Sequence, residues 1–156
     1  MLSNDVDMPA NDIIDINLQG ITKTKFRING EPGAIIELNL SDLSIMDRLE
    51  KGMKDLQKEM TSLSDIPNDD EHLSELMQAA DQKMRKYVDY IFDYPVSAVC
   101  AKNGTMYDPI DGKFRYEIII DGLTKLYADN INEQYRKLEA KLSKHTDKYI
   151  AAKRKK

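Results

Sequence analysis

A stripe of seven apolar side chains, spaced three or four residues apart between positions 43 and 63, constrains this chain more than any other sequence feature. The stripe comprises Leu43, Met46, Leu49, Met53, Leu56, Met60 and Leu63. This spacing places all of them on one face of an α-helix. It predicts a helix over about residues 42–63, with Ser41 as the N-cap and Asp42 in the first turn. A stripe this long has to be buried against another surface.

A second amphipathic segment follows a break at residues 65–70. Pro67 is incompatible with a continuing helix, and Asn68 or Asp69 is well placed to cap the next one. The second helix is expected from about residue 70 until Pro95 ends it. Its apolar face consists of Leu73, Leu76, Met77, Ala80, Met84, Tyr87, Val88 and Ile91.

The chain after Pro95 is irregular up to Gly112 and then becomes helical again. The apolar run at residues 96–100 is long enough for one buried helical turn. One long helix is predicted from Phe114 to about Tyr149, with candidate core positions at Ile119, Leu123, Leu126, Ile131, Leu138 and Leu142. Gly122 is its weakest position, because glycine costs about 1 kcal/mol relative to alanine inside a helix.

The N-terminal part alternates between apolar and polar residues, as half-buried strands do. Strands are predicted at about residues 12–18, 23–28 and 34–38, with turn-forming residues at 29–33. They predict a small antiparallel β-meander over residues 12–40, which needs a helix to support it because three short strands are near the minimum for stability.

The expected fold is therefore α+β and mainly α, in a single domain over residues 12–149. A small N-terminal antiparallel β-meander precedes a three-to-four-helix bundle at residues 41–149, which ends in a long C-terminal helix. Residues 1–11 are expected to form a flexible N-terminus, and residues 150–156 a basic flexible tail.

Charge and cysteine content narrow the class of protein. The 156 residues carry a net charge of −4 and contain one cysteine, Cys100, which cannot form an internal disulfide and is typical of a reducing compartment. No export signal is recognisable, and the longest apolar runs fall far short of the roughly 20 residues needed to cross a membrane. We therefore expect a cytoplasmic protein. The last 14 residues have a net charge of +5, which leaves −9 on the remainder and argues against nucleic acid as a partner.

The residue types that carry chemistry do not form a catalytic or metal-binding motif. His72 and His145 lack partners at metal-ligand spacing, and Cys100 lies in an apolar run that favours an inert core thiol. Residues 107–118 do not match a calcium loop, and residues 30–33 do not match a phosphate-binding loop. We therefore expect no enzymatic activity and no cofactor or metal.

Several segments together resemble phage tail assembly chaperones of tailed phages and prophages of Gram-positive bacteria. These are residues 35–45 (IIELNLSDLSI) leading into Arg48-Leu49, residues 114–117 (FRYE) before the long helix, and residues 144–149 (KHTDKY) followed by the lysine-rich end. The resemblance covers roughly residues 12–156 and consists of element order and apolar spacing.

The resemblance implies a protein of the host bacterial cytoplasm that binds the tape measure protein and helps to recruit tail tube subunits during tail assembly. It also implies a homo-oligomer, no catalytic residues, and a possible ribosomal frameshift near the lysine codons. In this interpretation, apolar helix stripes that the fold leaves uncovered bind a long helix of the partner. The candidate contact residues are Leu49, Met53, Leu56, Met60, Leu126, Leu138 and Leu142.

Two other functions remain open at this point. A small phage protein could bind, or be sensed by, a host defence enzyme through its acidic surface. A virion component such as a head–tail connector is the third possibility. The leading interpretation depends on one hypothesis: the chain has more apolar helix surface than its own fold can bury.

Overall fold

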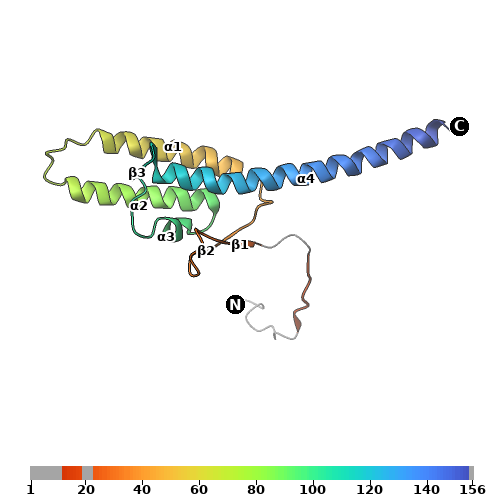
Figure 1. The fold of residues 1–156 in the computed structure, drawn as a ribbon, viewed down its shortest axis with the longest axis horizontal. Coiled ribbons are helices and arrows are strands. Elements are labelled where there is room, and N and C mark those ends of the chain that lie inside the picture. The colour runs from red at the N-terminus through yellow and green to blue at the C-terminus, as the bar shows by residue number, and fades with distance from the viewer. Residues whose placement is uncertain (1–11, 19–22, 155–156) are drawn as a thin grey trace, which may run out of the picture.

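The structure, a computed structural model, describes residues 12–18 and 23–154. In chain order the elements are β1 (Thr24–Arg27), β2 (Ile35–Leu38), α1 (Ile45–Ser64), α2 (Leu73–Phe92), α3 (Val96–Cys100), β3 (Pro109–Ile110), β4 (Lys113–Phe114) and α4 (Arg115–Arg154) (Figure 1). The expected fold class is confirmed: a small antiparallel sheet precedes the helices, and the last helix is long. The short helical turn after Pro95 is also confirmed, as α3.

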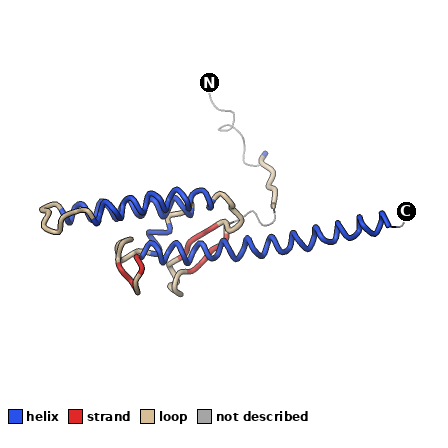
Figure 2. Tube along the Cα trace, turned by 90° about the horizontal axis from the view of Figure 1, so that it is seen from above, coloured by secondary structure: helices blue, strands red, loops and turns tan. Residues whose placement is uncertain are grey.

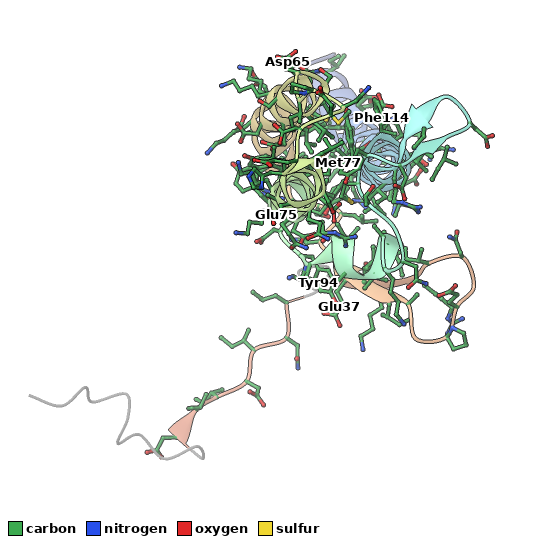
Figure 3. The ribbon with its side chains drawn as sticks, turned by 90° about the vertical axis from the view of Figure 1, so that its left-hand side faces the viewer. Glu37, Asp65, Glu75, Met77, Tyr94 and Phe114 are labelled. Atoms are coloured by element: carbon green, nitrogen blue, oxygen red, sulfur yellow. The ribbon has the colours of Figure 1, made fainter. Side chains whose placement is uncertain are left out.

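Helices α1 and α2 and the first half of α4 enclose the core. Figure 3 looks along them from the end where α1 and α2 are joined, with Asp65 and Glu75 at that end. The ring of Phe92 on α2 lies 6.2 Å from that of Tyr127 on α4. Each large core side chain contributes about 1.5–3 kcal/mol through burial. The largest fully buried side chains are Ile36, Leu38, Leu56, Met84, Val88, Ile91, Val96 and Met106.

Two contacts fix α1 against α2. Gly52 is buried where the helices approach each other, and a Cβ atom at this position would lie 2.4 Å from Cγ1 of Ile91. Arg48 donates from Nε to the carbonyl oxygen of Ile91 at 2.9 Å and so binds a carbonyl in the last turn of α2. The same guanidinium pairs with Asp42 at 3.1 Å, which links the loop before α1 to both helices.

The N-terminal sheet consists of the hairpin β1–β2, whose register pairs Phe26 with Ile36 and Thr24 with Leu38. Strands β3 and β4 form a second, shorter antiparallel pair. Ile36 and Leu38 are buried in the core. The turn contains Asn29 and Gly30 with positive φ angles of 51° and 73°, a conformation that these residue types tolerate better than most. The hairpin therefore covers the core with the β2 face that carries Ile36 and Leu38.

Two details of the predicted N-terminal half are wrong. Residues 13–18 form no strand and pair with no other segment of the described chain, so the sheet has two strands at this end and not three. Alternation indicates which side chains share a face, but it does not supply a partner strand. Helix α1 begins at Ile45 and not after Ser41, because Asp42 instead accepts hydrogen bonds from Ser44 and Arg48 in a turn ahead of the helix.

Helix α4 is longer than predicted. It continues past residue 149 to Arg154, so residues 150–154 of the predicted tail are helical. Its 40 residues span about 60 Å. From about residue 135 the helix projects beyond the other elements, as Figures 1 and 2 both show. The predictions for residues 1–11 and 155–156 lie outside the described residues.

The Gly52 contact generates a test of the α1–α2 packing. Gly52→Ala should lower the free energy of unfolding by about 1–3 kcal/mol, because the added methyl group overpacks a closed interface. Gly122→Ala is the matched control: its Cβ would meet nothing within 4 Å, so stability should rise by up to about 1 kcal/mol. Urea unfolding followed by circular dichroism measures both variants. Equal effects would show that α1 and α2 are not closely packed at Gly52.

Candidate functional site

An apolar groove runs between α1 and α4 and is the best candidate for a binding site. One end is lined by Ile45, Met46 and Leu49 from α1, facing Tyr127, Ala128 and Ile131 from α4. The other end is lined by Leu43, Ile131, Gln134, Tyr135 and Leu138, together with Ser41 and Asn130. Because both ends include Ile131, they form one continuous surface, which we call the α1–α4 groove.

The side chain of Asn130 joins α4 to the loop that lines this groove. Asn130 of α4 donates from its side-chain amide to the carbonyl oxygen of Leu40 at 3.1 Å. This contact brings residues 39–44 across α4 and places Leu43 beside Tyr135 in the lining of the groove. Leu43 and Met46 remain 53% and 63% exposed, so the groove is open to solvent on its α1 side.

The apolar surface continues from the groove along the projecting part of α4. Ile131, Tyr135, Leu138 and Leu142 follow one another at intervals of four, three and four residues, which is the spacing of a coiled-coil seam. Leu138 is 50% exposed and Leu142 is 65% exposed. No described element covers this seam beyond Leu138 (Figure 1). It can therefore pair with a helix from another chain.

Charge is divided unequally between the two parts of the molecule. Residues 135–156 include nine lysine or arginine and two acidic residues, a net charge of +7, which leaves −11 on residues 1–134. By helical spacing, Glu139 and Lys141 flank the seam on α4, and Arg136 and Lys137 lie further round the helix. The projecting helix is therefore basic as a whole, and the seam itself is apolar.

The structure places the predicted contact residues in different environments. Leu138 and Leu142 are exposed on the seam. Leu49, Met53, Met60 and Leu126 are half-buried and pack against the core. Leu56 is completely buried, so it belongs to the core and is not available to a partner. The stripe on α1 is thus divided: its middle packs internally, and its N-terminal end lines the groove.

Sequence reasoning did not identify the contribution of Tyr135 to the site. Its signal was present, since Tyr135 fits the same seam as Ile131 and Leu138. Leu43 and Met46 were recognised as stripe members but not as exposed ones. Their exposure depends on how α1 and α4 lie relative to each other, which the sequence pattern does not encode.

A cluster of ionisable groups lies between α2, α3 and the loop before α4, and it holds that loop in place. Asp81, only 8% exposed, accepts from the backbone N–H of Met106 at 2.7 Å and pairs with Arg85 at 2.9 Å. Arg85 also donates to the carbonyl oxygens of Ser97 at 3.3 Å and Ala101 at 2.8 Å. These bonds tie α3 and the following loop to α2.

Further pairs complete this network. Asp89 accepts from both the backbone N–H and the hydroxyl of Ser97, at 2.8 and 2.9 Å. Arg115, the first residue of α4, donates to Thr105 O at 3.1 Å and pairs with Asp108 at 3.1 Å. The hydrogen bond from the Thr105 hydroxyl, followed by that from the Thr105 backbone N–H, lowers the pKa of Asp108. Among the described residues, no buried side-chain nitrogen or oxygen lacks a partner. The cluster is therefore fully used in holding the fold.

The cysteine and histidine side chains do not form an activated group in the described part of the chain. Burial, reinforced by the charge of Asp89, raises the pKa of the Cys100 thiol from 9.0 to about 11, so the thiol stays protonated at neutral pH. His72 lies on the surface, 3.5 Å from Glu71 and 3.8 Å from Glu75. Residues 12–18 and 23–154 contain no group of three or more His, Cys, Asp or Glu side chains arranged to hold a metal ion.

No helix between residues 12 and 154, as far as the structure describes them, is both long and apolar enough to span a membrane. Protein-family models, curated proteins and solved structures give no match to the chain. The resemblance to phage tail assembly chaperones therefore stays a prediction from the sequence.

The network around Asp81 generates a second test. Arg85→Ala should lower the free energy of unfolding by about 3–5 kcal/mol, because it leaves a buried carboxylate without its ion pair. Lys54→Ala removes the exposed pair with Glu50 and should change stability by less than about 1 kcal/mol. Chemical unfolding of the two variants gives the comparison. Similar losses would mean that Asp81 is solvated.

The raised pKa of Cys100 generates a third test. In the folded protein the thiol should react slowly with a thiol reagent at pH 8, and in urea it should react at the rate of an ordinary cysteine. Because the folded pKa of about 11 exceeds the ordinary 9.0, this group's contribution to stability is complete below pH 9 and is lost as the pH rises to 11. Reaction rates measured across this range provide the readout. Fast labelling of the folded chain at pH 8 would contradict the burial of Cys100.

Proposed function

We propose that this chain is a phage tail assembly chaperone, which binds a long helix of the tape measure protein in the α1–α4 groove and helps to recruit tail tube subunits. Binding would take place in the host bacterial cytoplasm. The observation that carries the proposal is a continuous exposed apolar surface. It includes Leu43 and Met46 in the groove and Tyr135, Leu138 and Leu142 on the seam.

The geometry of the seam favours a helical partner. Apolar side chains spaced four and three residues apart on a straight helix fit the apolar face of a second helix, with side chains interlocking across the interface. The last 20 residues of α4, 135–154, span about 30 Å, and the end of the helix projects beyond the other elements in Figure 1, which gives room for several turns of a partner. A small ligand would need a closed pocket, and the groove is open.

Charge indicates what kind of helix fits. Arg136, Lys137, Lys141 and Lys144 lie on the projecting helix, so an identical helix from a second copy would bring like charges together. A partner helix with a net negative charge would instead be attracted to them. We therefore infer an amphipathic, acidic segment of the tape measure protein as the occupant.

The ionisable cluster supports a binding role in preference to catalysis. Asp81, Arg85, Asp89 and Arg115 all make hydrogen bonds to backbone groups or side chains of the protein itself. The thiol of Cys100 is held in its protonated form. These groups act in folding, which leaves the α1–α4 groove as the feature available for function.

Co-expression with the tape measure protein tests the proposal. The two proteins should co-purify, and the double variant Leu138→Glu/Leu142→Glu should abolish co-purification. Each leucine contributes ~2 kcal/mol when buried, so affinity should fall roughly a thousandfold. Ala140→Glu is the control for the added charge, because it places one glutamate on the same exposed helix, on the face opposite the seam. The control should bind as the unmodified protein does.

The salt dependence of binding distinguishes apolar binding of the tape measure protein from the alternative function, in which the acidic surface binds a host defence enzyme. A complex formed through the seam should survive moderate salt, whereas binding to a host enzyme through the acidic body should weaken steeply. Loss of the complex in Ala140→Glu as well as in the double variant would refute the seam as the contact. So would a complex that forms regardless of either substitution.

A further inference from the structure

Residues 13–18 carry four apolar side chains that are largely exposed within the described part of the chain. Ile13, Ile14, Ile16 and Leu18 are 61%, 86%, 77% and 61% exposed. The segment is extended and leads away from the helices, as Figures 1 and 3 show. Its apolar and polar residues alternate from Ile14 to Leu18, which is the pattern of a strand with one buried face.

The hairpin β1–β2 has a free edge that lacks a strand. The backbone N–H of Ile28 donates to Ala34 at 2.8 Å, and hydrogen-bonded positions alternate along an antiparallel pair. The N–H and C=O groups of Lys25 and Arg27 therefore point away from β2, toward the free edge of β1. Within the described residues nothing pairs with this edge. A sheet of two short strands is also below the usual minimum for a stable sheet.

The segment and the edge match each other on both faces. The β1 face that carries Phe26 is continuous with buried Ile36 on β2, and Phe26 is only partly covered. A third strand with Ile14, Ile16 and Leu18 on this face would cover Phe26 and extend the apolar layer. Its opposite face would then place Asp15 beside Lys25 or Arg27, an attractive pairing across neighbouring strands.

We propose that residues 13–18 of one copy add to the β1 edge of a second copy as a third strand. In the structure the segment leaves its own hairpin, so the edge of a second copy is free to receive it. If the two copies exchange segments reciprocally, they form a closed, two-fold dimer with no edge left on β1. This proposal does not rest on the proposed function, because it involves neither α4 nor the groove.

Light scattering coupled to size-exclusion chromatography of the full chain tests the exchange. The unmodified protein should be a dimer, and Ile14→Asp/Ile16→Asp should be a folded monomer, because these side chains are 86% and 77% exposed and contribute little to the core. Ile13→Asp is the control: it places one aspartate on the face with Asp15, on the side of Lys25 and Arg27, and should leave the dimer intact. Circular dichroism and thermal unfolding verify that each variant is folded.

A mixing experiment tests the edge itself. Lys25→Pro removes an N–H that points to the free edge, so it should block strand addition while the β1–β2 bonds remain. This variant should be monomeric alone. Mixed with Ile14→Asp/Ile16→Asp, it supplies an intact segment to an intact edge, and a heterodimer should form through one exchange.

Three results would overturn the proposal. The first is an unmodified protein that is monomeric at all concentrations, as expected if the segment folds back onto its own β1. The second is a dimer that persists in Ile14→Asp/Ile16→Asp. The third is a mixture of the two monomeric variants that does not associate. None of these results bears on binding of the tape measure protein, so the two proposals fail independently.

Discussion

The ion pair between Asp81 and Arg85 determines where the last helix begins. Arg85 binds carbonyl oxygens in α3 and in the loop after it, and Asp81 binds the backbone of Met106. Met106 in turn accepts a hydrogen bond from the N–H of Tyr116, in the first turn of α4. A charged pair on α2 therefore fixes, through a loop with little regular structure, the start of a helix of 40 residues. The orientation of α4, and with it the position of the groove, depends on this pair.

Polar contacts join neighbouring elements of the fold, and apolar side chains form its core. Hydrogen bonds and ion pairs set the connections: Arg48 joins α1 to α2, Asn130 joins the loop at Leu40 to α4, and Arg85 joins α2 to α3. Apolar burial then closes the bundle around Met84 and Leu56. Most of the large apolar side chains that remain exposed lie in the α1–α4 groove, on the seam and in the N-terminal segment, and those are the places where we propose binding.

The sequence predicted the helices better than their surroundings. Spacings of three and four residues located α1, α2 and α4, and Pro67 and Pro95 marked their breaks. The same spacing could not distinguish Leu56, which is buried, from Met46, which is exposed, because burial depends on where the neighbouring helix lies. The role of Arg85 was missed, since its partners are backbone atoms of a distant loop. The strand at residues 12–18 was predicted from alternation alone, and a strand also requires an edge to pair with.

The free half of α4 has a consequence for stability along the helix. Without tertiary contacts, each turn beyond residue 135 is held only by the turns before it and by intrinsic propensity, so protection of its amides should fall progressively toward Arg154. The part packed beside Phe92 does not share this gradient, because it opens only when the core does. A ligand that bound the outer turns would extend the cooperative unit outward, and part of its binding energy would be spent on ordering the helix. Affinity and helix content would then rise together.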